Sequence, residues 1–152
     1  MSSLKTAICF FVMVGLLLAA DAAVGTWKLN VGKSKFHPGP PPLSATLSYE
    51  ASGSGVKRTG EMVNADGTKI SFEYTAEYDG KDYPVTGNPN GDTIALKKVN
   101  DRTVEATLKK GGKVTTTAHR VVSTDGKTLT LTITGTDAKG QKIHNVQVFD
   151  KQ

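Results

Sequence analysis

The 152-residue sequence predicts an all-β protein, an antiparallel up-and-down meander closed into a single barrel of about 8–10 strands. Three observations lead to this fold class. Short segments of alternating hydrophobicity recur along the chain, turn signals separate them about every ten residues, and no amphipathic helix of useful length interrupts them. So many strands in one small domain must hide their edges, and closing the sheet into a barrel removes the edges altogether.

The first 22 residues have the composition of a secretory signal peptide. Lys5 precedes an apolar stretch over residues 7–20, and the small-residue triplet Ala20-Asp21-Ala22 follows it. A transmembrane anchor would need about 20 apolar residues and would not end in a cleavable triplet. We therefore expect cleavage after Ala22, a mature domain over residues 23–152, and a periplasmic or extracellular location with no membrane span in the mature chain.

The mature chain contains no cysteine, because the single one, Cys9, lies within the apolar stretch. Disulfides and a thiol nucleophile are thereby excluded from the secreted form. A domain of this length can bury enough apolar surface to be stable without disulfides. The net charge of +5 is spread along the chain, so it permits anionic partners without indicating them.

Only the segment over residues 30–44 departs from the alternating pattern. Its run from His37 to Pro42 contains four prolines, which exclude both a helix and a central strand. We expect an extended strap. A proline-rich ligand for an aromatic groove of a partner protein is the functional alternative.

The clearest strand covers Ile70 to Tyr78, where every second residue is apolar and every intervening residue is polar. One face of this strand should pack and the other should contact water. Half-buried antiparallel strands are predicted by the same period elsewhere. These are the segments with Leu47 and Tyr49; Ile94 and Leu96; Val104, Ala106 and Leu108; and Leu129, Leu131 and Ile133.

Turn residues lie between these strands. Pairs such as Asp79-Gly80 and Gly111-Gly112 supply the positive φ that tight hairpins need. They occur at residues 64–67, 79–80, 88–91, 111–112, 125–126 and 139–140.

Both ends of the mature chain resemble known barrel proteins. Gly25-Thr26-Trp27-Lys28-Leu29 resembles the G-x-W opening of the lipocalins and the first strand of the fatty-acid-binding proteins. The segments 125–132 and 146–151 resemble the last two strands of the fatty-acid-binding proteins. As a whole the chain is similar to small secreted bacterial lipocalin-like proteins. The resemblance implies a barrel in which Trp27 closes one end, with its indole N–H bonded to a backbone acceptor.

Two features depart from the fatty-acid-binding pattern. Those proteins insert a helical pair after the first strand, where this chain has the proline-rich strap. Their last strand carries an Arg-x-Tyr pair that holds the ligand carboxylate, and the matching positions here are Gln147 and Phe149. Glutamine can donate hydrogen bonds but carries no charge.

Two arginines are expected to point into the barrel. Arg58 shares a face with Val56 and Met62, and Arg120 shares a face with Val114, Ala118 and Val122. The resemblance also places an interior arginine close to position 120. An inward guanidinium needs an anion, a carboxylate or water, because burying it unpaired is costly. The alternative is that each arginine lies near a rim and extends outward.

The same reading gives the arginines apolar neighbours. Met62, Phe72, Tyr74 and Tyr78 would line a cavity with them, and apolar walls with a few polar groups are typical of small-molecule pockets. A filled core is the competing outcome, since a small barrel can be just wide enough for side chains.

Other chemistry is disfavoured. His119 and His144 should be separated by a whole strand, about 10 Å apart, and only His37 could join one of them, so no metal site or other cofactor is expected. The sequence contains no catalytic motif with its required spacing. The lysines at 97, 98, 109, 110 and 113 have no aromatic residues among them for base stacking, so no nucleic-acid partner is expected.

Three functions remain. The first is a secreted monomer that binds a small apolar or amphipathic molecule, with an anionic head toward Arg120. The second is a structural or interaction domain with a filled barrel. The third is an isomerase or cyclase that uses the cavity as a reaction chamber.

Overall fold

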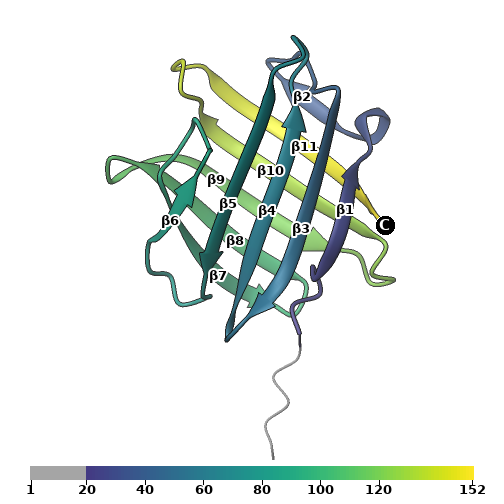
Figure 1. The fold of residues 1–152 in the computed structure, drawn as a ribbon, viewed down its shortest axis with the longest axis vertical. Coiled ribbons are helices and arrows are strands. Elements are labelled where there is room, and N and C mark those ends of the chain that lie inside the picture. The colour runs from purple at the N-terminus through teal and green to yellow at the C-terminus, as the bar shows by residue number, and fades with distance from the viewer. Residues whose placement is uncertain (1–19) are drawn as a thin grey trace, which may run out of the picture.

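The computed structural model describes residues 20–152, so most of the expected signal peptide, with Cys9, lies outside the described residues. Eleven strands and one short 3-10 helix follow one another along the chain (Figure 1). They are β1 (Gly25–Leu29), η1 (Val31–Lys33), β2 (Lys35–His37), β3 (Ser44–Ser52), β4 (Gly55–Val63), β5 (Lys69–Ala76), β6 (Tyr83–Thr86), β7 (Thr93–Asn100), β8 (Thr103–Lys110), β9 (Lys113–Val122), β10 (Thr128–Thr136) and β11 (Lys142–Lys151).

The strands form a closed antiparallel meander. From β3 to β11 each strand pairs with the next, and β1 pairs with both β3 and β11, which closes the barrel. Trp27 of β1 is thus in register with Leu47 on one side and Lys151 on the other. β2 pairs with the earlier part of β11 and β1 pairs with its last residues. The two short strands therefore lie one after the other along the same edge of β11. The predicted all-β barrel is confirmed.

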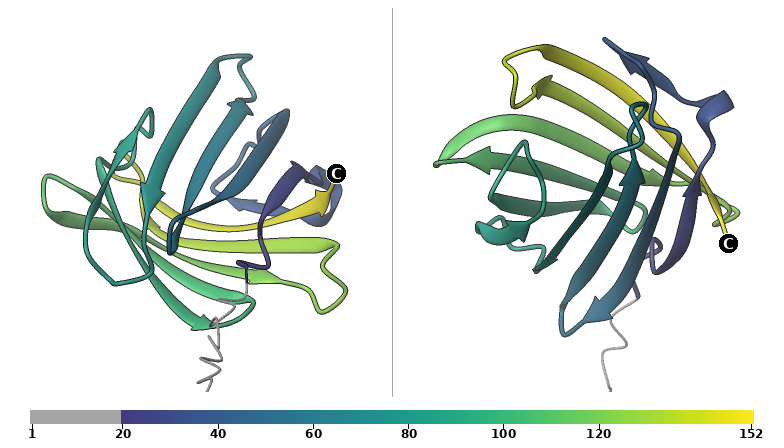
Figure 2. Two further views of the ribbon diagram at one scale, coloured as in Figure 1. Left: turned by 60° about the horizontal axis from the view of Figure 1, so that its bottom comes forward. Right: turned by 45° about the horizontal axis from the view of Figure 1, so that its top comes forward.

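Two walls face each other across the barrel. β3, β4 and β5 form one wall, and β7 to β11 form the other (Figure 2). The predicted alternation sets which side chains lie between the walls: Leu129 and Leu131 of β10 are buried, whereas the threonines beside them are half-buried. β6 contributes only short pairings to β5 and β7, so the wall is least continuous there.

The segment after β1 is more structured than the extended strap that we expected. Asn30 caps η1 by accepting a hydrogen bond from the Lys33 amide at 3.1 Å. The Ser34 hydroxyl donates a hydrogen bond to the Asn30 carbonyl and accepts one from the Val148 amide. These polar side chains fasten the segment to β11. Only the proline-containing stretch between β2 and β3 is without regular structure.

One side chain expected to face inward does not. Val114 is 54% exposed, because β9 has a bulge where Leu108 pairs with Thr116 but Lys109 pairs with Val114. The extra residue, Thr115, reverses the alternation. Its hydroxyl bonds to the carbonyl oxygens of Leu108 and Asn90. The inward face of β9 therefore begins at Thr116.

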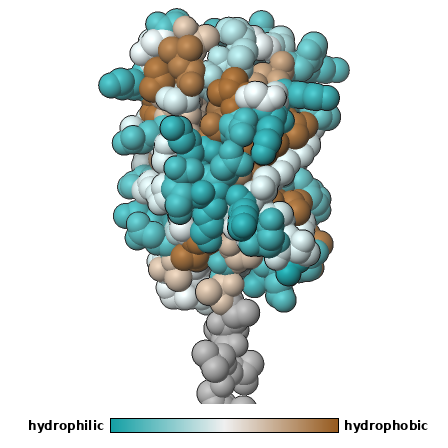
Figure 3. Space-filling view, turned by 90° about the vertical axis from the view of Figure 1, so that its right-hand side faces the viewer, coloured by the Kyte–Doolittle hydropathy of each residue, from teal (hydrophilic) through white to brown (hydrophobic). Residues whose placement is uncertain are grey.

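The outer surface is polar where the two ends of the barrel sheet meet. Figure 3 shows this face with hydrophilic residues across its middle and apolar groups mainly toward the upper end. Lys33 and Asp150 form an exposed ion pair here. Within residues 20–152 no helix has the length and apolar character needed to cross a bilayer.

Candidate ligand-binding cavity

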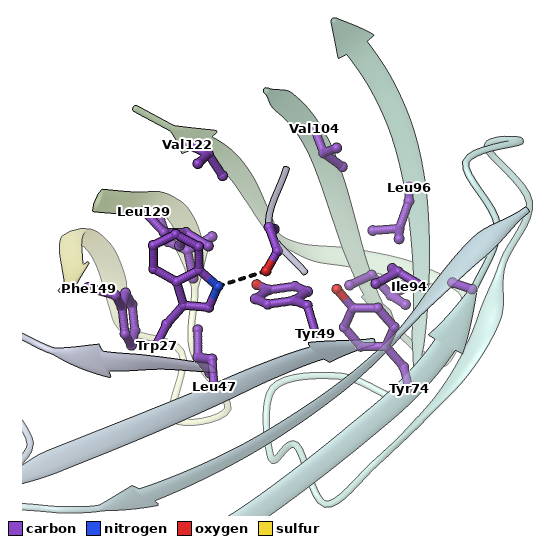
Figure 4. Close-up of a cluster of buried hydrophobic side chains, with 14 of the residues drawn as sticks. Trp27, Leu47, Tyr49, Tyr74, Ile94, Leu96, Val104, Val122, Leu129 and Phe149 are labelled. Atoms are coloured by element: carbon purple, nitrogen blue, oxygen red, sulfur yellow. Dashed lines mark hydrogen bonds between the residues drawn. The ribbon is translucent and has the colours of Figure 1, made fainter. Parts of the chain in front are cut away.

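Trp27 helps to close the lower end of the barrel. Its side chain is completely buried, and its indole nitrogen donates to the Ala23 carbonyl at 2.7 Å (Figure 4). Both features were predicted from the G-x-W opening and are confirmed. Phe149, Leu129 and Leu47 lie around the ring, so packed side chains surround Trp27 at this end.

An ion pair lies in the same closed end. Arg120 points inward, as expected, and its Nη2 donates to both carboxylate oxygens of Asp21 at 2.8 and 2.7 Å. The two side chains are 6% and 9% exposed. The Tyr78 hydroxyl and the Ala23 amide also donate to this carboxylate. Arg120 is therefore already neutralised by a residue of its own chain.

The titration behaviour of the pair follows from these contacts. Burial works to raise the pKa of Asp21, but the Arg120 charge and the hydrogen bonds from Tyr78 and Ala23 outweigh it and hold that pKa below its usual value. Burial, together with the hydrogen bond to Asp21, raises the pKa of Tyr78. At neutral pH the carboxylate is charged and the phenol is neutral.

Above the closed end the barrel contains a cavity of about 750 Å³. Pockets for small molecules typically have about 300–1,000 Å³, so the volume suits a ligand. The mouth lies at the upper end, between the proline-rich stretch and three turns, those after β4, β6 and β10. The filled-barrel alternative does not describe this structure.

Arg58 of β4 lies inside this cavity, whereas the other charged residues that line it, Asp66, Asp137 and Lys139, belong to the turns at its mouth. It forms no salt bridge among residues 20–152, and its Nε, like that of Arg120, is buried with no hydrogen-bond partner there. Its guanidinium lies 4.9 Å from the ring centroid of Phe72 and 5.7 Å from those of Tyr49 and Tyr74. Aromatic faces stabilise a cation partly, but they do not replace an anion. Arg58 thus holds an unneutralised positive charge within apolar walls.

A glycine makes room for one of these rings. Gly60 lies opposite Phe72 in the β4–β5 register, and a Cβ at this position would lie 2.3 Å from the Phe72 ring. Any larger residue would therefore move the ring from its place beside Arg58.

Tyr49 separates the cavity from the closed end. The Arg58 and Arg120 guanidinium groups both lie over its ring, at 5.7 and 4.9 Å. A second space of about 90 Å³ touches Tyr49, Tyr74 and both arginines. Burial raises the pKa of Tyr74 to about 12, against the opposing effect of the Arg58 charge, so its hydroxyl stays protonated.

Neutral polar groups accompany Arg58 in the cavity. Gln147 and Thr116 are 7% and 5% exposed, and both line the space. Asn145 lines it as well, and its side-chain oxygen accepts from the His37 amide. Together they provide hydrogen-bonding groups on the wall formed by β9 to β11.

The predicted site residues divide between two places. Arg58, Met62, Phe72, Gln147 and Phe149 line the large cavity, and Tyr74 and Arg120 line the smaller space below it. Tyr78 lines neither, because its hydroxyl is bonded to Asp21 in the closed end.

Two residues of this arrangement were missed. Tyr49 lies two residues after Leu47 on β3, so the alternation of this strand could have placed its side chain in the interior. Asp21 gave no signal, because it lies in a triplet whose pattern indicates a cleavage site.

The histidines lie as their strands predicted. His119 pairs with Thr132 and His144 with Thr134, so β10 separates them. His37 of β2 is directly opposite His144. Among residues 20–152 no three His, Cys, Asp or Glu side chains come together in a way that could hold a metal ion.

Fold and site together define a closed antiparallel barrel whose ligand-sized internal cavity contains an arginine, Arg58, without an ion-pair partner among residues 20–152. No protein-family model matches the sequence, and no curated protein does. A solved structure of the zebrafish ileal bile acid-binding protein complexed with cholic acid is similar, with a TM-score of 0.49 and 12% sequence identity, over 86% of this chain and 99% of that one. At this level of similarity nothing about that protein's ligand transfers to this chain.

Proposed function

We propose that this protein is an exported carrier that binds one small amphipathic anion, with its apolar part in the barrel cavity and its anionic head at Arg58. The observation that carries the proposal is that the Arg58 guanidinium, inside a cavity of about 750 Å³, forms no ion pair among residues 20–152. Of the two interior arginines, only Arg120 has a carboxylate partner in the chain. An anion at Arg120 would first have to displace Asp21, so the head group belongs at Arg58 and not at Arg120.

The rest of the cavity suits an apolar tail. Leu47, Met62, Ile70 and Ile133 provide apolar walls between Arg58 and the mouth. Gln147 and Thr116 can donate further hydrogen bonds to a carboxylate or sulfonate from the opposite wall. The anionic head replaces the missing counter-ion, and the buried tail contributes the hydrophobic part of the affinity.

The test is ligand selectivity at Arg58. The protein is titrated with 1-anilinonaphthalene-8-sulfonate, an anionic dye that fluoresces in apolar sites, and the dye is displaced by a fatty acid or by the fatty alcohol of the same length. A hydrogen bond to a charged group contributes about 1.5–3 kcal/mol. Arg58→Met should therefore weaken binding of the fatty acid by about ten- to hundredfold, and binding of the alcohol should change little.

Lys57→Met is the matched control. Lys57 precedes Arg58 on β4 but is exposed on the outer face, so this variant removes the same charge without touching the cavity. The proposal fails if the unmutated protein binds neither ligand. It also fails if the two variants reduce fatty-acid binding equally, because the effect would then come from net charge.

A further inference from the structure

The segment before β1 is part of the barrel's closed end. Exposure falls stepwise from Ala20, which is exposed, through Asp21 and Ala22, which are half-buried, to Ala23, which is 0% exposed. The Val24 amide donates to the Asp21 carbonyl at 3.0 Å, which folds these residues into a turn beneath Trp27. Among residues 20–152, the contacts with the barrel therefore start at Asp21.

Asp21 has a complete set of interactions for its charge. Its carboxylate accepts from Arg120, Tyr78 and the Ala23 amide, and its side chain is 9% exposed. These three donors come from β9, from the residues after β5 and from its own turn. A carboxylate with three such donors is a structural part of the folded protein.

Loss of Asp21 would leave two positive charges in one buried place. A chain starting at Ala23 would carry its ammonium group where the Ala23 amide now lies, and this amide and Arg120 donate to the same carboxylate oxygen of Asp21. Arg120 would lose its only ion-pair partner among residues 20–152. A buried charge without a partner is strongly unfavourable, and two like charges in the same apolar surroundings repel each other.

A chain starting at Asp21 avoids this. Its ammonium group would take the position next to Ala20, where the chain is exposed and the charge can be hydrated. All contacts of the Asp21 carboxylate would be retained.

We infer that the export signal is removed between Ala20 and Asp21, so that Asp21 is the first residue of the mature protein and the internal counter-ion of Arg120. The inference rests on the proposed export, but not on the ligand. Small residues before the bond are what processing requires, and the triplet pattern alone favours the bond after Ala22. The bond after Ala20 has alanines at positions 19 and 20 and Leu18 before them. The buried contacts of Asp21 are the reason to prefer it.

The test uses the full chain in cells that export it, with intact-mass measurement of the purified product. The unmutated chain should begin at Asp21. A mass lower by one aspartate and one alanine residue, which means a start at Ala23, would overturn the inference. Absence of any cleavage would overturn both the inference and the proposed export, so the two failures are distinguishable.

Two matched variants locate the bond independently of folding. A leucine directly before the cleaved bond blocks processing, because that position needs a small side chain. Ala20→Leu should therefore abolish the product that starts at Asp21 and give either uncleaved chain or a start at Ala23. Ala22→Leu should leave the start at Asp21. Blocked processing in Ala22→Leu with normal processing in Ala20→Leu would refute the inference.

Discussion

Replacing Asp21 by alanine, in a protein that retains residues 21–152, should destabilise the barrel strongly. The substitution leaves Arg120 buried without a counter-ion and removes the acceptor of the Tyr78 hydroxyl. Breaking a buried ion pair in this way costs about 3–5 kcal/mol. Because Asp21 lies at the edge of the fold, we expect the lower end, about 3 kcal/mol, which corresponds to a fall in the melting temperature of about 10 °C for a domain of this size.

The assay is urea unfolding followed by the fluorescence of Trp27, the single tryptophan. Asp82→Ala is the control, since Asp82 also forms an ion pair at 2.9 Å, but with Lys109 at the surface. Exposed pairs contribute about 0–1 kcal/mol.

The double variant completes the test. Asp21→Ala with Arg120→Met should be more stable than Asp21→Ala alone, because the unpaired charge is gone. Equal losses for Asp21→Ala and Asp82→Ala would refute the account of the closed end.

Three further outcomes are expected. Because Arg120 and its other hydrogen bonds hold the pKa of Asp21 below its usual value, the stability from this pair is complete above about pH 4 and is lost as pH falls through the folded-state pKa; acid unfolding of Asp21→Ala should lack this slope. Tyr74 has its pKa raised by burial from 10.0 to about 12, so stability should fall as pH rises through that interval, and absorbance at alkaline pH should show delayed ionisation of this phenol. Gly60→Ala should cost about 1–3 kcal/mol by overpacking and weaken dye binding, because its Cβ displaces the Phe72 ring beside Arg58; unchanged unfolding and binding would contradict the close contact.

The fold was predictable because the alternation of apolar and polar residues is a local property of each strand, and every strand of the barrel repeats it. The strand from Lys69 to Ala76 shows it: Tyr74 and Ala76 are buried, as their spacing indicates. The bulge in β9 was not predictable, because Thr115 is inserted by bonds to Leu108 and Asn90 that no local pattern encodes. Val114 was misplaced for this reason.

The site was predictable in its composition but not in its electrostatics. The alternation of inward and outward side chains predicted that Arg58 and Arg120 lie in the interior, and both do. Which arginine is free depends on Asp21, a residue 99 positions before Arg120. The sequence pattern around Asp21 predicts a cleavage site, so it gave no hint of a structural role. A distant pairing of this kind appears only when the strands are assembled.

The pairing of β1 with β11 also has a consequence for the order of folding. The last long strand of the described chain is what closes the sheet, and hydrogen bonds such as that between Asn30 and Asp150 join residues 120 positions apart. Contacts so distant in sequence form slowly, because a long loop must be closed before they stabilise anything. A chain emerging from the ribosome therefore cannot complete the barrel until β11 has been made. In the export proposed above, this delay would keep the chain unfolded for passage through a secretion channel, and it also exposes the edges of β1 and β10 to aggregation during that interval.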